Sequence, residues 1–335
     1  MEKPMGAAEK KRLQHKRFHI LLAAILIPLA LVMIWFRVHY RDFYESAQPA
    51  FRIPGLAESF VPQGIEACGN RDFLLSGYIV GSGSARLYYI GADGSSRAIR
   101  VVDKKGTTLA SHSGGICTNG PFTYLAGSGG KCYVLSSAEL FDPTSTQATI
   151  LGILQTENAA SYCYLAEGRL FVGEYEFGRF KTPFSHHITT PAGDKNTAVT
   201  LSYPLDGDLP FGVNPTPDAA WSTTERIQGM TFTDDGRVVL SASCYKASSR
   251  LLLYDWQAVQ ESQGIFWTGS AAVPLYYLDR STCTDVIPMP PYSEETVFEN
   301  GWLYVLFESA STRFQFGNLI GAQNVYRMAP PKWEK

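Results

Sequence analysis

Six polar side chains stand at two recurrent kinds of position in the sequence, and their chemical types suit ligand binding or proton transfer. Four of them lie at or just before an expected strand start: Gln63, His112, Gln228 and Glu294. The other two close strands that follow such a start: Glu174 and Glu308. Amide, imidazole and carboxyl groups can bind sugar hydroxyls through paired hydrogen bonds or hold a hydrated cation. The alternative is that these groups satisfy one another and the nearby backbone, as buried polar groups must.

Catalysis would fall to His112 as a general base, and metal binding to Glu174 and Glu308. Carboxylate oxygens suit a divalent cation such as calcium, which is the cofactor expected at such a site. No Asp can be assigned to orient His112, and no Gly-x-Ser-x-Gly elbow is present, so a Ser-His-Asp triad is not predicted. The histidines at 186–187 with Asp194 offer either a second metal site or a solvated loop.

The elements that position these residues belong to a repeat. Its clearest copy, residues 227–241, places two β-rich runs around Asp235-Gly236, a strong hairpin signal. Four other segments align on it, and the steps between equivalent positions are 51, 46, 68 and 66 residues. The equivalent residues are Gly64, Gly115, Ser161, Gly229 and Glu295. A repeat of this kind predicts an all-β fold, a β-propeller, with two β-sandwich domains as the competing architecture.

Five blades account for the aligned segments, and six are possible if an insertion hides another blade. In the fourth blade, residues 250–254 are expected to pair with residues 272–278. Residues 177–224 are expected to form an irregular excursion over one face. The last blade lacks an outer strand, which residues 51–54 or 58–61 could supply to close the ring. In such a ring the first strands line a central tunnel, so the polar residues above are expected to converge at its mouth.

The N-terminal part of the chain has the pattern of a membrane anchor. Residues 1–17 form a basic tail, residues 18–36 are almost continuously apolar, and residues 37–50 are expected to link them to a propeller over 51–330. Six Lys and Arg precede the apolar span, which predicts a cytoplasmic N-terminus and an extracytoplasmic body at the plasma membrane, in a single-pass protein. A cleaved signal peptide is the alternative, but the apolar span is long and no Ala-x-Ala site follows it.

Composition narrows the choice of partners. The net charge of −2 and the low charged fraction of 18% give no nucleic-acid footprint. Six Cys follow the anchor, and six allow 15 disulfide connectivities. Cys117 and Cys163 occupy equivalent positions in neighbouring blades, which favours core packing. One bridge, Cys244–Cys283, is the most that we expect.

Several short motifs recur in order along the chain, at Val61–Ile65, His112–Ile116, Val172–Glu174, Gln228–Met230, Leu240–Ser241 and Phe307–Ala310. Taken together, they resemble the motifs of a family of bacterial secreted or membrane-anchored β-propeller proteins. The resemblance spans roughly residues 55–330 and implies a fold but no particular reaction. More distantly, the chain is similar to gluconolactonase and paraoxonase propellers, whose central calcium is held by acidic and Asn side chains. No matching Glu, Asn, Asn, Asp ligand set can be placed here.

Three classes of function follow from these observations. The first is a membrane-anchored extracytoplasmic β-propeller that binds a ligand, glycan or protein partner at its central tunnel face. The second is a metal-dependent hydrolase, such as a lactonase or esterase. The third is a scaffold that contacts other envelope proteins. The fold alone does not choose among them, since propellers host all three.

Overall fold

The computed structural model of the chain describes residues 6–314 and 321–329. The chain divides into two compact units, Met1–Glu45 and Ser46–Lys335, and each is described by itself. Among the residues described, the first unit is helical and the strands lie in the second.

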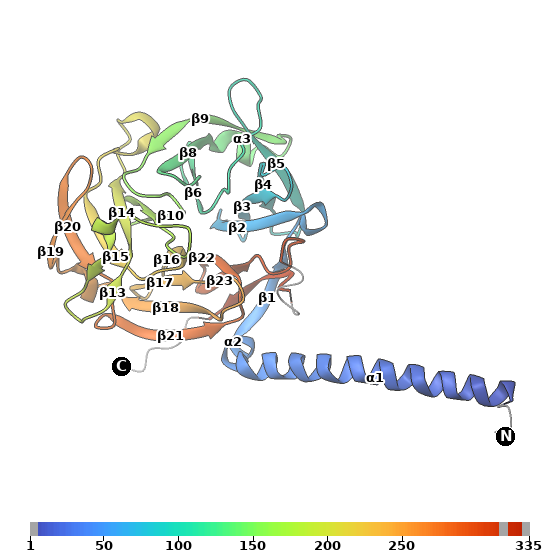
Figure 1. The fold of residues 1–335 in the computed structure, drawn as a ribbon. Helices are drawn as coiled ribbons and strands as arrows, with labels where there is room; N and C mark the ends of the chain where they lie inside the picture. Colours follow the sequence, from blue (N-terminus) through green and yellow to red (C-terminus); the bar gives the residue numbers. More distant parts are fainter. Residues whose placement is uncertain (1–5, 315–320, 330–335) are drawn as a thin grey trace. The chain divides into compact units, whose positions relative to one another are not determined.

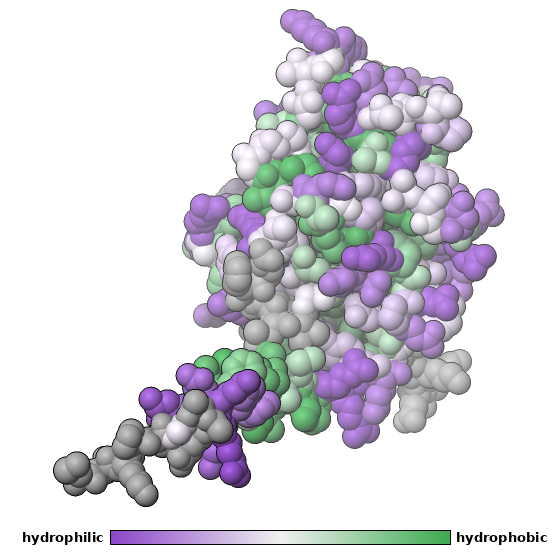
Figure 2. Space-filling view, turned by 90° about the vertical axis from the view of Figure 1, so that its right-hand side faces the viewer, coloured by the Kyte–Doolittle hydropathy of each residue, from purple (hydrophilic) through white to green (hydrophobic). Residues whose placement is uncertain are grey.

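Helix α1 (Ala7–His39) is long and apolar enough to cross a membrane or to act as a signal anchor, as predicted for residues 18–36. Figure 2 shows hydrophilic residues at its near end and hydrophobic residues behind them. The predicted linker, residues 37–50, is not irregular: α1 continues to His39, α2 (Arg41–Ser46) follows, and strand β1 begins at Ala47. The physical reason is that no Gly or Pro interrupts residues 29–48.

The strands of the second unit fall into five four-stranded groups, in which the strands of each group pair antiparallel. Two groups are joined by the parallel pair β5–β9, and a third is extended by two further strands. The first group comprises β2 (Phe60–Ala67), β3 (Phe73–Ile79), β4 (Ala85–Ile90) and β5 (Ser96–Val102). The second comprises β6 (Ile116–Asn119), β7 (Phe122–Ala126), β8 (Lys131–Ser136) and β9 (Gln147–Gln155). The third comprises β10 (Tyr162–Ala166), β11 (Arg169–Gly173), β14 (Ala198–Pro204) and β15 (Ala219–Thr223).

The last two groups follow the same plan. The fourth comprises β16 (Ile227–Phe232), β17 (Arg237–Ala242), β18 (Ser249–Asp255) and β21 (Cys283–Met289). The fifth comprises β22 (Ser293–Glu299), β23 (Trp302–Phe307), β24 (Asn324–Met328) and β1 (Ala47–Arg52). The hairpin predicted at Asp235-Gly236 is confirmed, because it joins β16 to β17 and Gly236 has φ +81°.

The first strands of the groups contact one another in a closed cycle, β2, β6, β10, β16, β22 and back to β2. Figure 1 shows the sheets of this unit arranged around a centre, which is the β-propeller fold predicted from the repeat. Each four-stranded group is called a blade below. The ring closes where β1 pairs antiparallel with β24, so the outer strand of the last blade comes from the N-terminal side, as expected, although it is Ala47–Arg52 and not residues 51–54 or 58–61. Pairing with β1 on one side and β23 on the other leaves β24 without an open edge, whereas β1 is the edge strand of that sheet.

Two expectations about outer strands were wrong. Residues 272–278 do not join the fourth blade: β20 (Ala272–Tyr277) pairs parallel with β15, and β19 (Gly264–Trp267) pairs with β20. The outer strand of the fourth blade is β21 instead. Residues 177–224 are irregular only in part, because they include β14 and β15 of the third blade. The remainder holds the small hairpin of β12 (Ile188–Thr189) and β13 (Lys195–Asn196).

Short helical turns complete the connections. They are η1 (Leu56–Glu58), α3 (Ser137–Phe141), η2 (Phe184–His186), η3 (Pro210–Gly212) and η4 (Ala258–Gln260).

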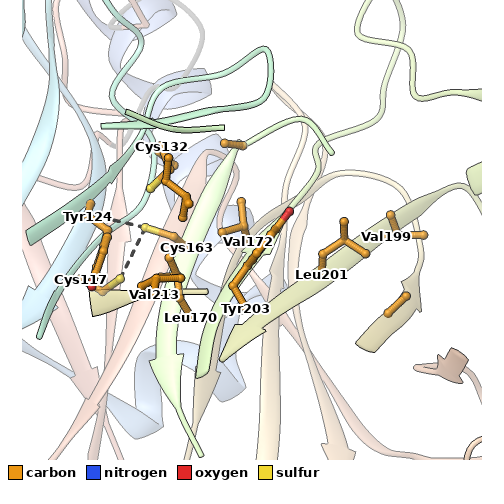
Figure 3. Packing of buried hydrophobic residues seen from close by; sticks show 14 of the residues in the cluster. Cys117, Tyr124, Cys132, Cys163, Leu170, Val172, Val199, Leu201, Tyr203 and Val213 are labelled. Carbon is orange, nitrogen blue, oxygen red and sulfur yellow. Dashed lines mark hydrogen bonds between the residues drawn. The ribbon is translucent and has the colours of Figure 1, made fainter. Parts of the chain in front are cut away.

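All six cysteines are free. Cys117 and Cys163 pack together in the core, with their Sγ atoms 3.6 Å apart and Cys132 beside them (Figure 3). This confirms the packing expected of these positions. The predicted Cys244–Cys283 bridge is wrong. Cys244 lies beyond the end of β17, where Ala242 pairs with Arg250, whereas Cys283 pairs with Tyr254 at the other end of β18.

Candidate functional site

A cavity of about 260 Å³ opens at the tunnel mouth of the propeller. Five of the six residues predicted from the sequence line it: Gln63, His112, Gln228, Glu294 and Glu308. Three of them stand on first strands, whereas His112 precedes β6 and Glu308 follows β23. Four of the five blades therefore contribute a predicted polar side chain to one cavity.

Local irregularities in the strands aim these side chains. The antiparallel register shifts between Pro62 and Gly64 in β2, and between Ile227 and Gly229 in β16, so Gln63 and Gln228 each occupy a bulge. A third shift in β22, between Ser293 and Thr296, contains Glu294. A bulge bends its strand and re-aims the side chain it carries. In β2 and β16 a Gly follows the bulged Gln directly, and this repeated Gln-Gly pair is the feature of the sequence that marks the bulges.

A pair of carboxyl groups forms the floor of the cavity. Glu294 and Glu308 are buried and hydrogen-bond to one another. Gln63 Nε2 donates to Glu308 Oε2 at 2.8 Å, and Gln228 Nε2 donates to Glu294 Oε1 at 3.3 Å. Burial raises the pKa of both carboxyls, and the Glu308 charge raises the pKa of Glu294 further. A contact between two carboxyls is stable when they share one proton, so the pair carries about one negative charge.

Aromatic and basic residues form the walls and the rim, and the sequence did not single them out. They are Tyr78, Tyr175, Arg179, Phe180, Lys181, Tyr245, Arg313 and Phe314. The only signal for three of them was that residues from 177 onward were expected to cross one face of the propeller. The others stand in ordinary loops or in a strand, where composition alone does not mark them.

Two of the three basic side chains of the rim, Arg179 and Arg313, lie over aromatic rings. The Arg313 guanidinium bonds the Tyr78 hydroxyl and lies 5.6 Å from the centre of that ring. The Arg179 guanidinium lies 5.0 Å from the centre of the Phe180 ring. Lys181 Nζ pairs with Glu176 Oε1 at 2.8 Å. Stacking of this kind holds a guanidinium in place without neutralising it.

His112 lies at the mouth, where its ring packs against the Tyr78 ring, with the centroids 4.9 Å apart and the planes tilted by 38°. The surrounding protein and the Arg313 charge lower the pKa of His112, although the ring remains exposed at the rim. The imidazole is therefore neutral at physiological pH. Within the described part of the chain, no side chain hydrogen-bonds its ring nitrogens, so no orienting partner accompanies it. Its role as a general base stays a prediction.

Glu174 does not line the cavity. Its carboxylate pairs with His186 Nδ1 at 2.9 Å and accepts the N–H groups of Ala159 and Val199 at 3.2 and 3.1 Å. Glu174 therefore connects His186, which lies in the excursion that follows residue 177, to strand β14 of the third blade. His187 and Asp194, proposed with His186 as a metal site, bond elsewhere: His187 contacts Thr182, and Asp194 pairs with Arg280.

The predicted metal ligands therefore do not share one site. Over residues 6–314 and 321–329, no group of three or more His, Cys, Asp or Glu is arranged to hold a metal ion. The carboxyls of the floor are bonded to amides and to each other, which leaves them poorly suited to bind a cation between them. We derive no chemical step through a metal, and the calcium expectation stays a prediction.

Comparison with known proteins adds no argument about the fold or the activity of the chain. No protein-family model matches the sequence, and no curated protein resembles it closely enough to count as a relative. Membership of a family of bacterial membrane-anchored propellers therefore stays a prediction.

Solved structures are similar at low identity. One is the PQQ-bound aldose sugar dehydrogenase of Streptomyces coelicolor, with 11% identity, 84% of this chain and 97% of that chain covered, and a TM-score of 0.45. Another is the glutaminyl cyclase of Myxococcus xanthus, with 11% identity, 84% and 96% covered, and a TM-score of 0.44. A third is the WD40 β-propeller domain of Doa1, with 9% identity, 85% and 97% covered, and a TM-score of 0.40. Each of these TM-scores lies below 0.5, so none of these likenesses carries an argument about the chain.

Proposed function

We propose that this protein binds a saccharide in the cavity at the tunnel mouth. The observation that carries the proposal is the convergence of two amides and two carboxyls, from Gln63, Gln228, Glu294 and Glu308, between aromatic walls. Amides and carboxyls offer donors and acceptors side by side, which suits hydroxyl groups. Aromatic rings offer flat apolar faces, which suit the C–H faces of a sugar ring. The small volume favours a ligand of one or two rings.

Binding is favoured over glycoside hydrolysis by the contact between the two carboxyls. Glycosidases of the usual kinds keep their carboxyls about 5 Å or more apart, so that the bond to be cleaved fits between them. Here Glu294 and Glu308 bond to each other. No comparable observation supports the two other functions, a metal-dependent hydrolase and an envelope scaffold.

We also propose that the propeller lies outside the cytoplasm, held by α1 in the plasma membrane. The support is the apolar helix itself and the six Lys and Arg in residues 1–17. A saccharide-binding propeller on this side would face the polysaccharides of the cell envelope.

The binding proposal is tested by calorimetric titration of the detergent-solubilised full chain with glucose, galactose and mannose, each with its uronate and 6-phosphate. We expect at least one of these sugars to bind. The double variant Gln63→Leu and Gln228→Leu should weaken that binding at least tenfold. Each substitution removes one amide and with it about one hydrogen bond to the sugar, worth about 1 kcal/mol.

The control is the pair Gln147→Leu and Gln155→Leu, which changes two exposed amides away from the cavity and should leave the affinity unchanged. If none of the sugars binds, or if the cavity variant folds and binds as tightly as the wild type, the proposed function is wrong.

A further inference from the structure

The rim of the cavity carries positive charge, and the Arg313 charge also acts on the buried Glu308, whose pKa it lowers. Arg179 and Arg313 both line the mouth and are exposed. In the described part of the chain, neither forms an ion pair with a carboxylate, whereas Lys181 beside them is paired with Glu176. Both guanidiniums are instead stacked on aromatic rings, which fixes their direction.

The floor has the opposite character. Glu294 and Glu308 are only 2% and 9% exposed, and their remaining charge is already met by two amides. The cavity is thus polarised along its depth, with acceptors at the bottom and two fixed cations at the top. A neutral ligand would hydrogen-bond to the groups at the bottom of the cavity and form no ion pair with the two arginines. A ligand with an acid group at one end would satisfy both.

We propose that the natural ligand is an acidic saccharide, a sugar whose carboxylate or phosphate is bound by Arg179 and Arg313 at the rim. This inference rests on the proposed function and names the ligand class for the same site. The planar guanidinium fork pairs with two oxygens of a carboxylate or a phosphate at once, which a single ammonium cannot do. The hydroxyls of the sugar face Gln63 and Gln228, so the ligand enters in one orientation only.

Repulsion from the floor supports the same orientation. An acid group pushed to the bottom would meet the buried carboxyl pair and lose its water without gaining a cation. At the rim it keeps part of its hydration and meets Arg179 and Arg313. The floor therefore acts against the reversed ligand, and the rim acts for the correct one.

The test compares each neutral sugar with its own acids in the titration of the full chain. Glucose, galactose and mannose are the neutral members, and their uronates and 6-phosphates are the acidic members. We expect at least one acid to bind ten times or more tighter than its parent sugar. The uronate and phosphate arms then show which acid group the rim selects.

The double variant Arg179→Gln and Arg313→Gln should reduce the affinity for that acid to the level of the parent sugar. Arg179→Lys with Arg313→Lys should restore part of the preference, because charge remains but the fork is lost. The control pair Lys104→Gln and Lys105→Gln removes two exposed charges away from the cavity and should preserve the preference. Raising the salt concentration should narrow the difference between acid and parent.

The outcomes separate the two proposals. If neutral sugars bind as well as their acids, or if the arginine variant keeps the preference, saccharide binding stands and the acidic class is wrong. If no sugar of either kind binds, both proposals are wrong.

Discussion

Glu295 fills the centre of the propeller, and the small residues of the repeat make room for it. Its carboxylate Oε2 accepts the N–H groups of Ile65 at 2.9 Å and Ile116 at 3.3 Å, which belong to two other blades. A Cβ added at Gly115 would stand 2.4 Å from Glu295 Oε1, and one at Gly229 would stand 2.7 Å from Glu295 Cα. A Cβ at Gly115 would also stand 2.4 Å from the backbone N of Cys163, so close packing around Glu295 requires glycine at Gly115 and Gly229.

Replacing Gly229 by alanine should destabilise the propeller. The new Cβ would meet the backbone of Glu295, which cannot move aside as the end of a flexible side chain could. Overpacking of this kind costs typically about 1–3 kcal/mol. Urea unfolding of residues 46–335 measures the loss. Gly207→Ala is the matched control, since a Cβ there meets nothing within 4 Å, and a loss as large at Gly207 would contradict the steric explanation.

Glu66 should make the fold more stable in mild acid than in base. Burial raises its pKa from 4.5 to about 7, so between these values the folded chain holds a proton that the unfolded chain has released. The stabilisation is complete below pH 4.5 and is lost as the pH rises through 7, with a size of about 1–3 kcal/mol.

The measurement is the unfolding free energy of residues 46–335 at pH 5 and pH 8. Glu66→Gln should reduce the difference between the two, whereas Glu261→Gln, which alters an exposed side chain, should leave it unchanged. Buried Glu294, Glu295 and Glu308 act in the same direction and keep part of the slope. An unchanged slope in Glu66→Gln would contradict the assignment.

At the scale of elements, the inner strands were predictable from the sequence, whereas the outer strand of the fourth blade was not. The first two strands of the blades are largely buried and carry apolar runs, as in β17, in which every residue is buried. The outermost strand is half exposed, and β21, with Asp285 and Pro288 in it, gives a weak strand pattern. The more apolar run at 272–278 was therefore preferred for that place, but it packs on the neighbouring blade.

Strand β1 should decide whether the ring stays closed. A chain beginning at residue 53 lacks β1 and leaves β24 with one unpaired edge, whereas a chain beginning at residue 46 retains the pair. We expect the shorter chain to melt several degrees lower and to aggregate at concentrations where the longer one is monodisperse. Thermal unfolding and light scattering compare them directly. Equal behaviour of the two chains would show that closure by β1 contributes nothing.

At the scale of the whole molecule, the N-terminal helix should fix the location of the protein. The full chain should remain in the membrane fraction after alkaline carbonate washing, and a chain beginning at residue 46 should not. In right-side-out membrane vesicles, an added protease should digest the propeller but not a tag on residues 1–17. Protection of the propeller, with digestion of the tag, would reverse the proposed topology.

The sequence by itself determined the propeller fold, the apolar helix and five of the six residues that were expected at one site. It could do so because a repeat marks equivalent places, and equivalence in a ring brings distant residues to the same mouth. Only the tertiary structure decided which carboxyls meet: Glu308 joins Glu294, Glu174 turns to His186, and Glu295 crosses the tunnel. The rim cations Arg179 and Arg313 were also hidden, because loops carry no periodicity and their approach depends on how the blades are packed.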